Sequence, residues 1–208
     1  MENLVFATGN VNKGYEIEER FNKEEIPIEI VEINFQEPEI NDIEFVSKSK
    51  AAQAYKILNR PCFVIDSGFN IHNYPGNPDY PGAYVRRSGL SENIDYLLDV
   101  MKNVCDRTCA FLDCLTFYDG EEFYCFYGKD EGIITYEKRG VENKAMRSKL
   151  WYLFQPDDSS KTLAEMTDIE RLSRKDGHLS AKEQFIEWYK INYLNNKSLK
   201  KELVGNIK

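Results

Sequence analysis

The sequence predicts an α/β fold, a mixed sheet flanked by helices and arranged as one two-lobed domain. Short apolar runs alternate with segments of helical periodicity, which is typical of α/β chains. An early apolar run turns through small polar residues into a helix, and two later runs are joined by Asp119 and Gly120, a hairpin signature. No internal repeat or low-complexity linker is present, so we expect one domain over residues 1–195 and a lysine-rich tail at 196–208.

The amino-acid composition limits which partners and which cellular compartment we expect. A chain of 208 residues with 42% hydrophobic content is long enough for a sizeable core. A net charge of −8 argues against nucleic acid and against anionic membrane as partners, so an anionic ligand must meet local cations. There is no basic segment followed by an apolar leader, and no apolar run approaches membrane-spanning length. We therefore expect a cytoplasmic protein.

The cysteines predict a reduced protein without a zinc site. They are odd in number, lie in or beside apolar runs and show no CxxC spacing. We expect them to be reduced core residues. They are Cys62, Cys105, Cys109, Cys114 and Cys125.

The first sixteen residues predict a strand, a turn and a helix. Residues 4–7 are a short apolar run that predicts a buried strand, and residues 8–10 end it. A helix follows from residue 11 or 12, with Ile17 and Phe21 on its apolar side. Lys13 in its first turn opposes the helix dipole, which an anionic ligand at the helix N-terminus would explain. An ordinary connection with a surface lysine is the alternative.

Carboxylates follow two of the expected elements. Residues 35–42 form an acidic loop, in which Glu37, Glu39 and Asp42 are each either solvated or ligands for a hard cation. Asp66 follows the apolar run at residues 62–65, and an acid at the carboxyl end of a buried strand is where α/β sheets place their chemistry. A simple turn is the alternative there.

Periodicity predicts the other elements. Helices are expected at 43–59, carrying Lys50, at 90–104 and at 180–194, and a short one after Thr167 or Asp168 with Ile169 and Leu172 inward. Strands are expected at 28–33, 62–65, 108–119, 122–127, 132–137 and 150–154, and a rigid loop at 73–84.

Five segments, in order, resemble the inosine triphosphate pyrophosphatase family. FATGNVNKGYE is similar to that family's S/T-GNxxK opening, and Lys50 stands at the matching distance before IDSGF, which resembles its acidic pair followed by SGL. YPGAY is similar to its FPGxY, and FQPDDSSKTLAEM to its FxP…KTxAEM block. Any one of these would be weak, but their common order over most of the chain is specific.

The resemblance implies an elongated α/β fold with a central cleft, usually as a homodimer. It implies hydrolysis of a nucleoside triphosphate to the monophosphate and pyrophosphate with Mg²⁺. By matching position, Asp66 would be catalytic, and Glu37 and Asp66 would bind the metal. The residues that would contact the substrate are Thr8, Gly9, Asn10, Asn12, Lys13, Lys50, Ser67 and Gly68.

Three motifs of the family are altered in this chain and one further position differs, and these changes concern the metal and the base. Ile65 stands where the family has the first acid of its pair. Residues 147–151 replace the FGWDP or FGYDP motif, and the SHR motif is absent, although His178 lies near its place. Arg171 falls where the family has a substrate-contacting lysine. We expect Trp151, Arg171 and His178 to contact the base, with core packing the alternative for Trp151.

Two other interpretations remain open beside an active pyrophosphatase. Ile65 and the missing base motifs are compatible with a catalytically impaired nucleotide-binding or regulatory protein. An unrelated α/β enzyme acting on another phosphorylated metabolite would require the whole motif series to be coincidental. We favour the active enzyme because the phosphate-binding and metal-binding positions all match.

The altered base motifs predict weakened base selectivity. Discrimination between a 6-keto and a 6-amino purine needs placed donors and acceptors, whereas stacking accepts any purine. We expect inosine triphosphate to have an advantage well below about a hundredfold over adenosine and guanosine triphosphates. Values of kcat/KM for inosine, xanthosine, adenosine and guanosine triphosphates, in ribo and deoxy forms, measure this. An advantage of a hundredfold or more for inosine or xanthosine would contradict the expectation.

Overall fold

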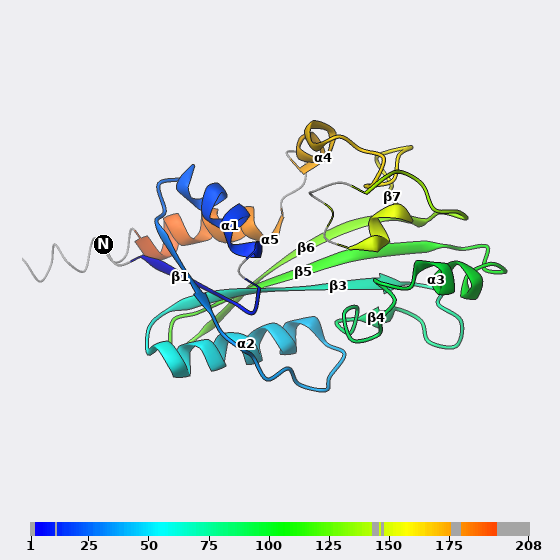
Figure 1. The fold of residues 1–208 in the computed structure, drawn as a ribbon. Helices are drawn as coiled ribbons and strands as arrows, with labels where there is room; N and C mark the ends of the chain where they lie inside the picture. The colour runs from blue at the N-terminus through cyan, green and yellow to red at the C-terminus, as the bar shows by residue number, and fades with distance from the viewer. Residues whose placement is uncertain (1–2, 11, 143–145, 147, 176–179, 195–208) are drawn as a thin grey trace, which may run out of the picture.

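The computed structural model describes residues 3–10, 12–142, 146, 148–175 and 180–194. A mixed seven-stranded sheet has the order β2-β1-β3-β5-β6-β7, and β4 pairs with β3 (Figure 1). The strands are β1 Leu4–Thr8, β2 Ile28–Glu32, β3 Cys62–Ile71, β4 Tyr80–Gly82, β5 Thr108–Tyr118, β6 Phe123–Ile134 and β7 Phe154–Pro156. The helices are α1 Asn12–Asn22, α2 Ile43–Leu58, α3 Ile94–Val100, α4 Asp168–Lys175 and α5 Ala181–Trp188, with a 3₁₀ turn η1 Lys149–Tyr152 and a π-helical segment η2 Tyr189–Leu194.

β3 is the strand that organises the sheet. It pairs with β5 along its whole length, antiparallel, from Cys62 to Ile71. On its other edge it pairs in parallel with β1 only as far as Phe63, and with β4 only from Phe69 onward. Within the described residues, positions 64–68 therefore have a strand on one edge alone, and this interval is called the sheet gap below.

Alternation along β3 assigns its side chains to two faces of the sheet. Cys62 and Val64 belong to an apolar cluster with Ala51 and Ala54 of α2. Phe63 and Phe69 belong to clusters on the opposite face. Consequently Asp66 lies on the face covered by α2, and its neighbour Ser67 lies on the other face.

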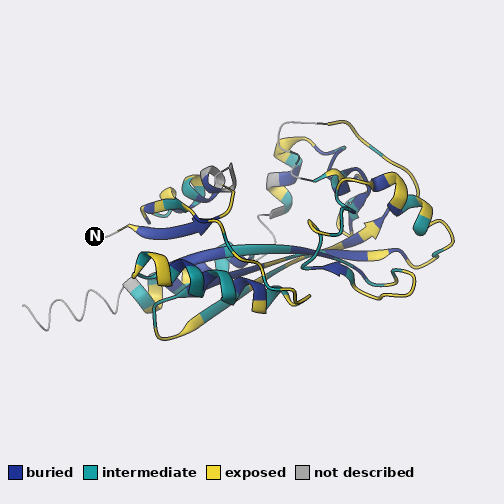
Figure 2. Ribbon diagram, turned by 60° about the horizontal axis from the view of Figure 1, so that its bottom comes forward, coloured by how far each residue is buried: buried dark blue, intermediate teal, exposed yellow. Residues whose placement is uncertain are grey.

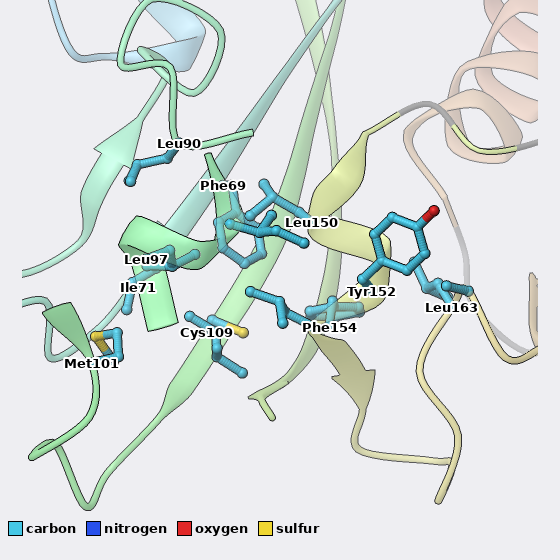
Figure 3. Packing of buried hydrophobic residues seen from close by; sticks show 14 of the residues in the cluster. Phe69, Ile71, Leu90, Leu97, Met101, Cys109, Leu150, Tyr152, Phe154 and Leu163 are labelled. Carbon is cyan, nitrogen blue, oxygen red and sulfur yellow. The ribbon is translucent and has the colours of Figure 1, made fainter. Parts of the chain in front are cut away.

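The face opposite α2 carries two apolar clusters. The α1/α5 cluster joins β1, β3 and β5 to α1 and α5 and contains Leu4, Phe6, Ile17, Phe21, Phe63, Leu115, Phe117, Phe185 and Ile186. The α3/β7 cluster, at the far half of the sheet, contains Phe69, Ile71, Leu97, Met101, Cys109, Leu150, Tyr152 and Phe154 (Figure 3). Burial follows the inner strands, while helix surfaces and loops are exposed (Figure 2).

The predicted fold class agrees with this architecture, but three strand predictions are wrong. β3 continues through Asp66 to Ile71, where residues 62–65 alone were expected, because β5 pairs with every residue of it. Residues 123–134 form one strand, where two were expected, for the same reason. The expected strand at 150–154 begins instead as η1, whose first turn is capped by the Ser148 hydroxyl accepting from Leu150 N–H.

Predictions for the helices and cysteines are also corrected. The helix expected at 90–104 is shorter, Ile94–Val100, because the Asn93 side chain caps it. Ile169 is 77% exposed, not inward. Cys105 is exposed, whereas Cys62, Cys109 and Cys114 are buried as expected. The side chain of Leu172 and the tail at 196–208 lie outside the described residues.

Within the described part of the chain, no helix combines the length and the hydropathy that a membrane span requires. The predicted cytoplasmic location stays a prediction.

Phe63 is expected to be a main stabilising residue of the α1/α5 cluster. Its fully buried ring lies 4.9 Å from that of Phe6 and 5.2 Å from those of Phe21 and Phe185, between centroids. Phe63→Ala leaves a cavity and should lower the free energy of unfolding by about 3–5 kcal/mol in chemical denaturation. Phe123→Ala, at a 37% exposed ring, is the matched control and should cost about 1 kcal/mol. Equal losses would contradict this assignment.

Candidate functional site

At the sheet gap, one ammonium lies between two carboxylates. Lys50 projects from α2 with a side chain that is only 12% exposed. Its Nζ lies 2.9 Å from Oδ2 and 3.0 Å from Oδ1 of Asp66, and 2.7 Å from Oε1 of Glu37. The structure thus brings together three of the residues predicted from the sequence, from a loop, a helix and a strand.

The acidic loop is fastened to α2 at both ends. The Gln53 side chain accepts from Gln36 N–H and donates to the Gln36 carbonyl, both at 2.9 Å. Asp42 is the N-cap of α2, where its side chain accepts from Phe45 N–H. The Gln53 side chain therefore holds the loop backbone next to Glu37 against the helix that carries Lys50. Asp42 acts as a capping residue.

Arg87 also holds the loop, and the sequence analysis missed it. Its guanidinium donates to the Glu37 carbonyl at 2.9 Å and to the Pro38 carbonyl at 3.4 Å, and lies 3.3 Å from Oε2 of Glu37. The available signal was the basic pair Arg86 and Arg87, one residue after YPGAY, in an acidic chain. A chain with a net negative charge can bind an anionic ligand only where positive side chains lie close together, and this pair provides such side chains.

The YPGAY segment approaches the same loop closely. The Asn41 side chain accepts from Ala83 N–H at 2.8 Å. Gly82 has a φ of +60°, and a Cβ there would lie 2.3 Å from Asn41 Oδ1, so glycine is required. A Cβ on Gly68 would lie 3.0 Å from the Gly82 carbonyl oxygen, which explains the predicted residue Gly68 by close backbone approach.

The cations around Glu37 keep its carboxylate charged. Burial raises the pKa of Glu37, but the hydrogen bond from Lys50 and the charges of Lys50, Arg87 and Arg86 outweigh burial and hold the pKa below its ordinary value. The group therefore stabilises the fold at pH values above its unfolded pKa, and this contribution is lost as the pH falls through the lower folded pKa.

The β1–α1 turn begins at the edge of the sheet gap. β1 runs parallel to β3, and continuing their register from Phe6 opposite Phe63 places Thr8 next to Ile65, at the edge of the sheet gap. The Thr8 hydroxyl accepts from Asn10 N–H at 3.1 Å, which closes the turn before α1. Gly9 and Asn10 are exposed. The side chains of Asn12 and Lys13 lie outside the described residues, so their phosphate contacts stay predictions.

Ser67 and Ile65 lie on the opposite face from Asp66. Ser67 Oγ donates to Asp113 Oδ1 at 2.6 Å, across the β3–β5 pair. Ile65 packs partly buried against the α1/α5 cluster. A carboxylate at position 65 would therefore not join the group formed by Asp66 and Lys50, and its replacement by isoleucine leaves that group complete.

Two of the residues predicted to contact the base, Trp151 and Arg171, lie elsewhere. Arg171 is buried and donates to the carbonyls of Leu163, at 3.2 Å, and Met166, and pairs with Asp168. Its guanidinium lies 5.3 Å from the centre of the Trp151 ring. Trp151 is partly buried and packs against the α3/β7 cluster, which agrees with core packing, the alternative to a base contact. The structure does not bring Arg171 to the Lys50 group, and His178 lies outside the described residues.

Comparisons with known proteins agree with one another. A family model described as the Ham1 family matches residues 4–188. A dITP/XTP pyrophosphatase of Pyrococcus horikoshii is 32% identical over 193 residues, covering 91% of this chain and 97% of that protein. A protein of the same name from Methanopyrus kandleri is 29% identical over 190 residues, again with 91% and 97% coverage. The structure of a HAM1 protein from Coxiella burnetii superposes with a TM-score of 0.72 at 20% identity, covering 90% of this chain and 95% of that one, and shows the same fold.

The ion-pair geometry predicts that Lys50 controls the pKa of Glu37. Lys50→Met removes the hydrogen bond and the nearest positive charge, so the pKa of Glu37 should rise when measured by carboxyl-carbon NMR without divalent cations. In wild type, the free energy of unfolding rises as the pH increases from the folded to the unfolded pKa of Glu37. In Lys50→Met this rise should be smaller. Lys56→Met, at an exposed position of the same helix, is the control. An unchanged Glu37 titration would contradict the geometry.

Proposed function

The chain belongs to the Ham1 family, and on that basis we propose that it is a nucleoside triphosphate pyrophosphatase that converts non-canonical purine nucleoside triphosphates to monophosphates and pyrophosphate. The observation that carries this proposal is the ammonium of Lys50 held between Glu37 and Asp66 at the sheet gap, beside the β1–α1 turn. The two archaeal relatives named dITP/XTP pyrophosphatase support the substrate class.

The triphosphate is bound by the turn and by lysines. α1 begins at Asn12, shortly after β1 ends at Thr8, and the backbone N–H groups of such a helix N-terminus favour phosphate oxygens. Lys50 and Lys13 add positive charge, and an ammonium in contact with a phosphate forms a charge-assisted hydrogen bond. In this assignment the Lys50 ammonium passes from the carboxylates to the phosphates when the nucleotide binds.

Asp66 acts on the attacking water. Hydrolysis breaks the bridge between the α- and β-phosphates and adds the elements of one water molecule. The carboxylate of Asp66 orients that water and takes up its proton, because both of its oxygens contact Lys50, the cation assigned to the phosphates. Glu37 stays ionised owing to its lowered pKa and provides negative charge to bind a cation.

The residues present fit a magnesium ion that arrives with the nucleotide. Glu37 and Asp66 converge on one point, the Lys50 nitrogen, whereas the described residues contain no group of three or more acids, histidines or cysteines suited to a metal. Mg²⁺ is typically held by one or two carboxylates together with substrate phosphates. When bound, Mg²⁺ neutralises phosphate charge and orients water.

Base recognition is assigned to residues outside the Lys50 group. Trp151, Arg171 and His178 stay candidates for base recognition, with Arg171 requiring release from its backbone carbonyls. The names of the archaeal relatives favour inosine-like or xanthine-like bases, and the nucleotide panel above decides how strong that preference is. A homodimer in the cytoplasm is the expected form of the protein.

Asp66→Asn is expected to abolish hydrolysis while leaving the fold intact. The amide keeps the shape of the side chain but cannot take up a proton or bind Mg²⁺ strongly, so pyrophosphate release should fall by about a hundredfold or more. Asp42→Asn is the matched control, because asparagine caps a helix as well as aspartate and the site is untouched. Turnover of Asp66→Asn at the wild-type rate would refute the role given to this residue.

A further inference from the structure

Two of the five cysteines lie on neighbouring strands with one hydroxyl between them. Cys125 of β6 is paired with Thr116 of β5, and Cys114 stands two residues before Thr116 on the same strand. Thr116 is paired with Val64, which packs against α2, so by alternation all three side chains lie on the face that α2 covers. The Thr116 hydroxyl oxygen lies 3.5 Å from the Cys125 sulfur and 3.8 Å from the Cys114 sulfur. These three residues are called the thiol cluster below.

The two thiols of the cluster differ in exposure. Cys114 is buried, whereas Cys125 is only partly buried, so a small molecule in solution can reach the Cys125 sulfur. Cys62 and Cys109 are buried like Cys114, and burial raises the pKa of both of their thiols. A thiol that stays protonated and buried is unreactive. Cys125 is therefore the accessible member of the cluster.

The surroundings of Cys125 stabilise its thiolate. A thiolate only accepts hydrogen bonds, so the Cys114 thiol and the Thr116 hydroxyl act as its donors. The ammonium of Lys48 on α2 adds positive charge. These contacts outweigh burial and the opposing charge of Glu44, and they hold the pKa of Cys125 below its ordinary value. The thiolate is the form of cysteine that attacks electrophiles.

We propose that Cys125 is a modification site, at which a hydroperoxide oxidises the thiolate to a sulfenic acid and Cys114 is the thiol that activates it. The sulfur attacks the terminal oxygen of the hydroperoxide, an S–O bond forms and the O–O bond breaks. The leaving hydroxide or alkoxide takes a proton from the solvent. Sulfur loses two electrons and the peroxide gains them. An accessible thiolate beside a second thiol is typical of oxidation-sensitive cysteines.

Exposure alone predicts a different order of reaction among the cysteines. Cys105 is exposed, whereas Cys125 is partly buried. If Cys114 and Cys125 only fill space in the sheet, Cys105 should react first because it is the more accessible thiol. If the thiol cluster activates Cys125, Cys125 should react first in spite of its lower exposure. The wild-type chain thus contains its own comparison.

The experiment treats the full chain with hydrogen peroxide in the presence of dimedone, which traps sulfenic acids. Peptide mass spectrometry gives the rate of oxidation at each cysteine, and Cys125 counts as oxidised whether it carries dimedone or forms a disulfide. Cys125 should be oxidised about tenfold faster than Cys105 at neutral pH, since an ordinary thiol is only a few per cent thiolate there. Equal rates, or faster oxidation of Cys105, would overturn the proposal.

Variants test how Cys125 is activated. Cys114→Ala removes the donor thiol and should slow the oxidation of Cys125 about tenfold, and thermal unfolding checks that this variant is folded. Lys48→Met changes a partly exposed position, leaves the core intact and should also slow the reaction. Lys56→Met, at an exposed position of the same helix, is the matched control and should keep the wild-type rate. An unchanged rate at Cys125 in Lys48→Met, or in folded Cys114→Ala, would overturn the proposal.

Discussion

The continuous pairing of β3 with β5 is the constraint on which the rest of the structure depends. Ten consecutive residue pairs hold β3 straight across the sheet while its other edge changes partner from β1 to β4. The interval between those partners leaves one edge of residues 64–68 without a paired strand among the described residues. Because β1 ends there, the turn into α1 begins at the gap, and because α2 covers one face, Lys50 reaches Asp66 there.

A single strand thereby serves two surfaces. Asp66 faces α2 and meets Lys50 and Glu37, whereas Ser67, the next residue, faces the opposite side and meets Asp113. This division explains why the departure at Ile65 leaves the ion group unchanged, since that side chain packs with the apolar cluster.

The sequence predicted local features well and long-range ones poorly. Periodicity located β1, α1, β2 and α2 within a residue or two, since each is determined by its own apolar pattern. Strands were expected to end before Asp66 and near residue 128, but both continue because they pair with β5 through polar residues. No local sequence signal indicates how long the neighbouring strand is. The grouping of Glu37, Lys50 and Asp66 came from family resemblance, while Arg87, fifty positions from Glu37, became evident only in the folded chain.

The ion group at the sheet gap couples the binding of metal to the binding of nucleotide. Lys50 and Arg87 carry as much positive charge as Glu37 and Asp66 carry negative charge, so the group without ligands is electrically balanced. A lone divalent cation must compete with an ammonium already in place, and a lone polyphosphate must draw that ammonium from its carboxylates. When both arrive, each removes the competitor of the other. Metal and nucleotide therefore bind with positive thermodynamic linkage, and each raises the affinity of the protein for the other by the same factor.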